Sequence, residues 1–257
     1  MKIKTVTITG ADNNTDINEM LEISNQYPFV EWGILFSPKR IGEERYPDMS
    51  WVFELCKTFI VNPTIQLSAH LCGGYTREML TGKDDLIRNN LEKYLGAFSR
   101  RQLNFNSSKD AVNLQGFFQL LEEQSEGHFI LQQNNANFTI CHDVRNRNIK
   151  NIDFLYDSSG GRGTVASQWK KPFDGFFTGY AGGLSPDNLE YELKKIQEVC
   201  GDAEIWIDTE SHVRTNCVLD MNKVKQFLGI ASKYVSQLKQ KKKLKKEFQS
   251  LKKKRVH

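Results

Sequence analysis

The chain has 257 residues, of which 39% are apolar and 26% charged, so it can bury one large core or two small ones. It has no apolar run of about 18 residues, which argues against a membrane-spanning helix, and its polar start, MKIKTVTITG, predicts a strand rather than a signal peptide. The five cysteines are odd in number and show no CxxC spacing. We therefore expect free thiols in a reducing cytoplasm, with no metal and no cofactor.

Charge is distributed unevenly along the chain. Residues 238–257 carry ten Lys or Arg and the single acidic residue Glu247, whereas the rest of the chain has a net charge of −5. We predict two regions: a folded body over 1–237 and a Lys-rich tail over 238–257 that is helical or disordered. The basic tail could bind nucleic acid or an anionic surface, or simply aid solubility.

Eight short β-rich runs alternate with amphipathic stretches along the body. The predicted strands are 4–9, 30–36, 64–70, 101–105, 128–133, 152–157, 175–181 and 204–208. The predicted helices are 15–26, 49–60, 85–98, 113–124, 185–200 and 220–235. Thr15 is the expected N-cap of the first helix, and Ser185 and Pro186 are expected to open the fifth. The segments after the fifth and sixth strands give no clear helix.

This alternation predicts parallel strands joined by right-handed crossovers. Both a (β/α)₈ barrel and a doubly wound open sheet have this rhythm. Strands of an open parallel sheet are buried on both faces, but here one face is apolar and the other turns polar toward each strand's carboxyl end. We therefore predict a (β/α)₈ TIM barrel whose polar groups meet at one mouth.

Two glycines follow the seventh predicted strand. In such barrels, the loops after strands seven and eight often bind phosphate through backbone N–H groups. Gly182 and Gly183 occupy the first of these loops, and Ser211 and His212 the second. The alternative is that the glycines only form a tight turn.

Several segments resemble the phosphoribosylanthranilate isomerase family. YAGGLSPDNL resembles its strand-seven phosphate loop, IDFLYDSSGGRG its strand six and the loop that follows, and WGILFSPKRIGEERYP its second strand and basic loop. The family's fourth strand resembles RQLNF, and its first strand resembles VTITGADNNTDI. Its last strand, second phosphate loop and final helix resemble WIDTESHVRTNCVLDMNKVKQFL. The resemblance extends to about residue 230 and implies a barrel of the ribulose-phosphate-binding kind.

The resemblance also implies residue roles. The family isomerises a phosphorylated ribosylamine by an Amadori rearrangement, in which its general acid corresponds to Asp157. Its contacts to the aromatic amine correspond to Asp208 and, with a short insertion, Arg45. Asn104 lies on the polar face of the fourth strand and is a further candidate for substrate binding.

Two departures from the family pattern affect the expected chemistry. The family's base is a Cys that ends strand one, where this chain has Thr9, and an aliphatic hydroxyl is too weak a base near neutral pH. The family's Ser-Gly in the second phosphate loop is Ser211-His212 here. His70, at the end of the third strand, is the leading substitute base, and Cys72 is a second candidate.

The loop after Asp157 carries Arg162, which could donate to a carboxylate or phosphate as the loop closes, or could sit in a plain flexible turn. The sequence thus predicts a barrel that binds or isomerises a phosphorylated sugar or another anionic small molecule. A barrel that binds without catalysis, and a lyase or hydrolase on the same scaffold, remain alternatives.

Overall fold

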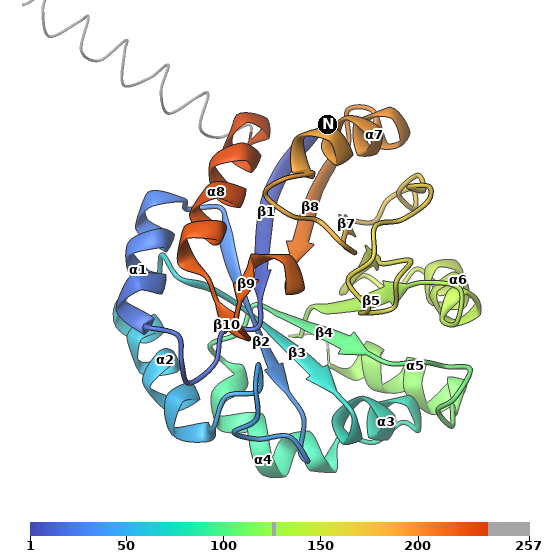
Figure 1. The fold of residues 1–257 in the computed structure, drawn as a ribbon. Coiled ribbons are helices and arrows are strands. Elements are labelled where there is room, and N and C mark those ends of the chain that lie inside the picture. Colours follow the sequence, from blue (N-terminus) through green and yellow to red (C-terminus); the bar gives the residue numbers. More distant parts are fainter. Residues whose placement is uncertain (125–126, 236–257) are drawn as a thin grey trace, which may run out of the picture.

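A computed structural model describes residues 1–124 and 127–235 and shows a closed barrel of eight parallel strands (Figure 1). The strands are β1 (Lys2–Thr9), β2 (Val30–Phe36), β3 (Gln66–Cys72), β4 (Arg100–Asn104), β5 (Phe129–Gln133), β6 (Ile152–Tyr156), β7 (Thr178–Tyr180) and β8 (Glu204–Thr209). Pairing of β1 with β8 closes the sheet, which confirms the barrel and excludes the open sheet. The tail predicted over 238–257 lies outside the described residues.

Helices surround the barrel in chain order (Figure 1). They are α1 (Ile17–Gln26), α2 (Met49–Val61), α3 (Gly74–Leu80), α4 (Asp85–Leu95), α5 (Leu114–Glu123), α6 (Phe138–Arg147), α7 (Leu189–Cys200) and α8 (Met221–Ala231). The described part of the chain also contains two 3₁₀ turns, Ser211–Val213 and Ser232–Tyr234, and a small hairpin of β9 (Arg214–Thr215) and β10 (Val218–Leu219). Within the described ranges no helix is both long and apolar enough to cross a membrane.

Two helix starts differ from the sequence prediction. The N-cap of α1 is Asp16, whose carboxylate accepts from the N–H of Asn18 at 2.8 Å, because the Thr15 hydroxyl instead accepts from the N–H of Asp12. The fifth predicted helix begins at Leu189 rather than Pro186. The N–H of Ser185 donates to the Asn188 side chain, and the N–H of Asn188 donates to the Ser185 hydroxyl. These bonds form a turn over 185–188, and the helix begins only after it.

The outer and inner faces of the barrel differ in chemistry. The outward side chains of the strands, such as Val6, Leu67 and Ile207, are fully buried in the main hydrophobic core. Inside the barrel, a small apolar cluster of Ile130, Leu155, Ala181 and Trp206 fills the side formed by β5 to β8. Trp206 is completely buried, so it fills the barrel and is not free to stack on a ligand.

The barrel interior also holds a buried ion network near the amino ends of the strands. The Arg100 guanidinium bonds Glu31 at 2.7 Å and Asp153 at 3.3 Å, and it lies 4.3 Å from the ring centre of Trp206. The inner face is therefore polar near the amino ends of the strands as well as at their carboxyl ends, which was not predicted from the sequence. Charged groups occur there because Arg100 and Glu31 satisfy each other inside the barrel.

Candidate active site

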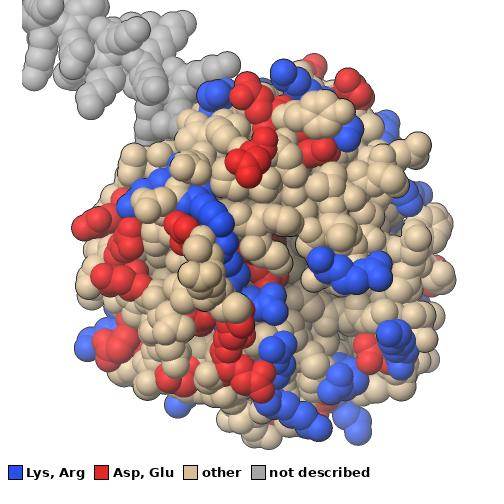
Figure 2. Space-filling view, in the orientation of Figure 1, with Lys and Arg blue, Asp and Glu red and all other residues tan. Residues whose placement is uncertain are grey.

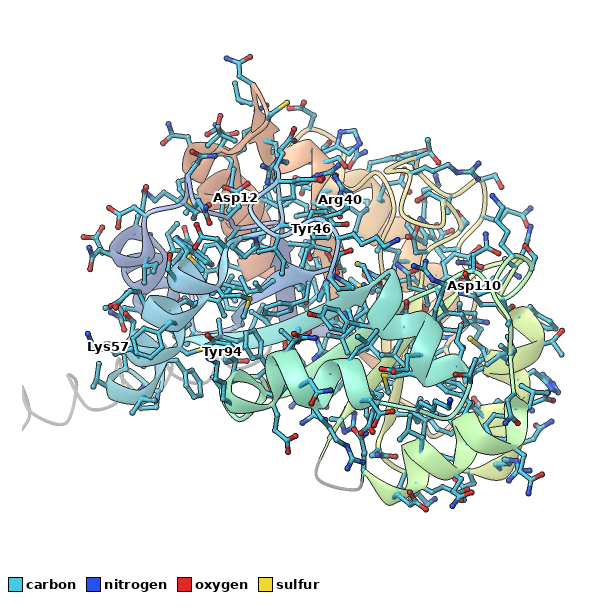
Figure 3. The ribbon with its side chains drawn as sticks, turned by 90° about the horizontal axis from the view of Figure 1, so that it is seen from below. Asp12, Arg40, Tyr46, Lys57, Tyr94 and Asp110 are labelled. Atoms are coloured by element: carbon cyan, nitrogen blue, oxygen red, sulfur yellow. The ribbon has the colours of Figure 1, made fainter. Side chains whose placement is uncertain are left out.

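A cavity of about 480 Å³ opens at the carboxyl ends of the strands and appears as a hollow with Lys and Arg at its edge (Figure 2). In side view, the lining residues Arg40 and Tyr46 lie in the upper part of the molecule, and Asp110, which also lines the cavity, lies to their right (Figure 3). The cavity brings together most residues that the sequence singled out, from seven of the eight strands or the loops after them: Thr9, Arg45, His70, Cys72, Asn104, Asp157, Gly182, Gly183, Asp208, Ser211 and His212. Arg162 does not line it.

Asp208 and Thr9 meet on one wall of this cavity. The Thr9 hydroxyl donates to Asp208 Oδ1 at 2.9 Å, and both side chains are buried. Burial raises the pKa of Asp208 well above its ordinary value, the Thr9 bond opposes this rise, and the negative charge of Glu210 adds to it. The carboxyl of Asp208 is therefore biased toward its protonated form, which can donate a proton.

His70 lies near Thr9 and is only 1% exposed. Burial lowers its pKa to about 4, so the imidazole is neutral near pH 7. Its Nε2 has no hydrogen-bond partner among the described residues. A Cβ at Gly33 would lie 2.5 Å from Thr9 Oγ1 and 2.8 Å from His70 Nε2, so a residue without a side chain keeps the space between these two groups open.

Cys72 lies at the end of β3 in a different environment. Burial raises the pKa of its thiol to about 11, and Asn104 Nδ2 lies 3.2 Å from the sulfur. The neighbouring Tyr46 also has a pKa raised by burial, to about 12. At neutral pH the sulfur is thus a thiol and not the thiolate that a base would require.

The Asp157 carboxylate is engaged by the loop that follows β6. It accepts from the N–H of Ser159 at 3.0 Å, the hydroxyl of Ser159 at 2.6 Å and the N–H of Gly161 at 2.7 Å. Both oxygens therefore bond the residues just after Asp157. In this conformation the carboxylate orders the loop at the cavity wall.

The loops after β7 and β8 present unused backbone donors. Among hydrogen bonds between described residues, the N–H groups of Gly182, Gly183, Ser211 and His212 donate to no protein acceptor. Gly182 and Gly183 have positive φ angles of 103° and 66°, and a Cβ at Gly183 would approach the backbone of Val165, so only glycine fits. The helix N-terminus contributes less than expected, because α7 begins six residues after Gly183.

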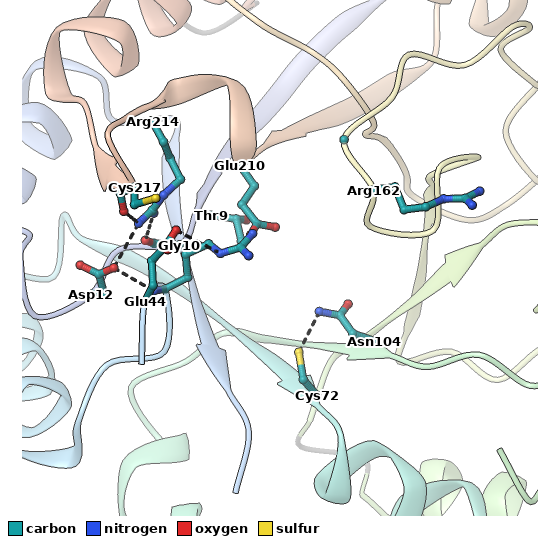
Figure 4. Close-up of polar contacts among 12 residues, drawn as sticks. Thr9, Gly10, Asp12, Glu44, Cys72, Asn104, Arg162, Glu210, Arg214 and Cys217 are labelled. Atoms are coloured by element: carbon teal, nitrogen blue, oxygen red, sulfur yellow. Dashed lines mark hydrogen bonds and ion pairs between the residues drawn. The ribbon is translucent and has the colours of Figure 1, made fainter. Parts of the chain in front are cut away.

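Charged pairs close the rim beside β1 (Figure 4). Arg45 Nη1 donates to Glu210 at 2.8 Å, and the backbone N–H of Arg45 donates to the Asp12 carboxylate. Arg214 pairs with Asp12 at 3.2 Å. The Arg45 guanidinium thus has an acidic partner before any ligand arrives. Asp12 follows β1 closely in sequence, but nothing local marks Arg214 as its partner or Glu210 as the partner of Arg45.

His212 and Arg162 hold the long segment between β6 and β7. His212 Nε2 lies 2.9 Å from the carbonyl oxygen of Gly163, and Arg162 Nε donates to the carbonyl of Ser159 at 2.8 Å. Nε2 of His212 therefore contacts this loop and is not free to bond a ligand in the cavity. Nowhere in the described ranges do three His, Cys, Asp or Glu side chains gather in a way that could hold a metal ion.

Comparison with known proteins reveals similarity of fold. No family model matches the chain, and no curated protein matches it by sequence. The structure of monomers of phosphoribosylanthranilate isomerase from Thermotoga maritima matches 89% of this chain and 98% of its own at 17% identity, with a TM-score of 0.54. N-(5'-phosphoribosyl)anthranilate isomerase from Pyrococcus furiosus matches the same shares at 14% identity, with a TM-score of 0.53. The predicted resemblance is confirmed for the fold.

Proposed function

We propose that the barrel binds a small phosphorylated sugar in its mouth and isomerises it by acid–base catalysis. One observation carries the proposal: a buried carboxyl with a raised pKa and a buried imidazole with a lowered pKa face one cavity. Burial moves Asp208 toward its protonated form and keeps His70 neutral near pH 7, so the cavity holds a proton donor and a proton acceptor.

The phosphate group belongs at the loops after β7 and β8. The free N–H groups of Gly182, Gly183, Ser211 and His212 supply donors without adding a charge that would need its own partner. Barrels of this architecture commonly hold phosphate at this position. With the phosphate there, the sugar extends toward Asp208, Thr9 and His70.

The proposed reaction moves two protons. Asp208 donates its proton to the ring oxygen of the cyclic sugar, the bond from that oxygen to C1 breaks, and an open-chain form results. His70 then removes the proton from C2, and the electron pair of that C–H bond forms the enol or enolamine. Return of the proton from His70 to C1, and transfer of the C2 hydroxyl proton to Asp208, gives the ketose and restores both groups. We assign the acid to Asp208 rather than Asp157, because the Asp157 oxygens already accept three hydrogen bonds from its own loop.

Two measurements test this proposal. Calorimetry should detect binding of ribose 5-phosphate but not of ribose, and NMR in D₂O should detect exchange of the sugar's C2 proton. His70→Gln and Asp208→Asn should slow that exchange by roughly 10²-fold or more while leaving binding nearly intact. His142→Gln on α6 is the matched control. Absence of binding by any phosphorylated sugar would overturn the proposal.

Thr9 favours a second candidate function, in which the barrel binds the same ligand without turning it over. The hydroxyl cannot act as the base that a thiolate supplies at this position in the similar family. Ligand binding without C2 exchange, unchanged by Thr9→Cys, would support this second function. Exchange that appears only in the Thr9→Cys variant would also indicate that the native chain is a binding protein.

A further inference from the structure

A second cavity of about 380 Å³ adjoins the mouth cavity over the loops after β4, β5 and β6. The two cavities share the walls Phe105, Asn106, Ser159 and Gly160. Apart from Ala136, the remaining lining of the second cavity is polar or basic and consists of Lys109, Asn134, Asn135, Ser158 and Arg162. None of these residues takes part in the proposed proton transfers.

The charge of the second cavity differs from that of the first. Asp110, Asp157, Asp208 and Glu210 line the mouth cavity, whereas no acidic residue lines the second one. Among the ion pairs between described residues, Lys109 and Arg162 have no acidic partner, and neither has Arg77 of the mouth cavity. Arg40 and Arg45 at the mouth pair with Glu43 and Glu210. The second cavity therefore keeps two positive charges available for a ligand.

Lys109 and Arg162 come from two different loops. Lys109 follows β4, in the turn where the N–H of Lys109 bonds the carbonyl of Asn106. Arg162 follows β6, in the loop that Asp157 and Ser159 order, and its Nε already donates to the carbonyl of Ser159. That bond anchors Nε and leaves the two terminal nitrogens of the guanidinium as further donors.

We propose that the second cavity binds a second anionic group of the substrate, so that the protein prefers a sugar carrying two anionic groups. This inference rests on the proposed function, because the first group is the phosphate held by the loops after β7 and β8. A phosphate or carboxylate suits Arg162, which can offer two parallel N–H donors, and Lys109, which adds a point charge. The amides of Asn106, Asn134 and Asn135 add neutral polar groups around that anion.

Calorimetry with paired ligands tests this inference. Ribulose 1,5-bisphosphate should bind about tenfold or more tightly than ribose 5-phosphate, because charged hydrogen bonds are added. 6-Phosphogluconate compared with glucose 6-phosphate shows whether a carboxylate can serve as the second group. If neither doubly anionic ligand binds more tightly than the monophosphate it is compared with, the inference is wrong. Binding of the monophosphates would still support the proposed function.

Variants separate a built site from general electrostatic attraction. The Lys109→Ala/Arg162→Ala double variant should lose the advantage of the bisphosphate while its affinity for ribose 5-phosphate stays within about twofold. Lys2→Ala/Lys194→Ala removes the same charge from exposed positions that line neither cavity and should preserve the advantage. Equal losses in both double variants, or equal losses for both ligands in the first, would overturn the inference.

Discussion

Thr9 donates a hydrogen bond to Asp208 across the seam where β1 closes the barrel against β8. The two residues are 199 positions apart in the chain, and each is buried. The bond restrains the rise in the pKa of Asp208 that burial causes. Thr9 is thus a positioning residue for Asp208 in the proposed reaction, even though it cannot itself serve as a base.

Asp208 should make the protein less stable as the pH rises. Its pKa is higher in the folded than in the unfolded chain, so above about pH 4 the folded state binds more protons and the free energy of unfolding falls. Asp208→Asn should remove this part of the decline. Urea unfolding at pH 5 and pH 8 measures it, and an identical pH dependence in both proteins would contradict the assigned pKa.

His70 should have the opposite effect on the acid side. Its pKa of about 4 lies below the unfolded value of about 6.5, so stability is complete above pH 6.5 and is lost as the pH falls toward 4. The full loss is on the order of 3 kcal/mol for this buried group. His70→Gln should flatten the unfolding free energy over that window, whereas His142→Gln should leave it unchanged.

Gly33 should not tolerate a side chain. The added Cβ of Gly33→Ala would press on Thr9 Oγ1 and His70 Nε2, so we expect a loss of about 1–3 kcal/mol in stability and weaker sugar-phosphate binding. Gly96→Ala is the matched control, because Gly96 has helical angles and no atom within 4 Å of the new Cβ. Thermal unfolding and calorimetry measure both variants, and equal behaviour would show that the space beside Gly33 is not restricted.

The buried ion network should contribute far more to stability than an exposed pair of the same kind. Glu31→Gln removes a charge that Arg100 needs inside the barrel, and we expect a loss of roughly 3–5 kcal/mol. Glu43→Gln breaks the exposed pair with Arg40 and should cost less than about 1 kcal/mol. Urea unfolding at neutral pH compares the two, and similar losses would disprove the difference in environment.

The cysteines should differ in reactivity toward an alkylating agent. All five are free, Cys217 is exposed, and burial raises the pKa of Cys72 and Cys56 to about 11. Iodoacetamide at pH 8 should therefore modify Cys217 first, as followed by mass spectrometry. Cys217→Ser should remove the fast phase. Rapid modification of Cys72 in that variant would show that its thiolate is accessible after all.

The alternation of apolar and polar residues allowed the barrel and its polar mouth to be predicted. In β3, for example, Leu67 and Leu71 lie on one face and Ser68 and His70 on the other, since side chains of a strand alternate between faces. The helix α6 was not predicted because its apolar stripe is weak. The interior ion network was missed because Glu31 and Arg100 lie 69 positions apart.

The sequence by itself determined which groups end the strands, because parallel strands of one barrel all deliver their carboxyl ends to the same mouth. Thr9, His70, Asp157 and Asp208 could be placed there from the pattern alone. Only the tertiary structure decided what each group can do. Burial and neighbours from distant strands bias Asp208 toward its protonated form, keep His70 neutral and occupy Asp157, and such neighbours depend on barrel closure rather than on local sequence.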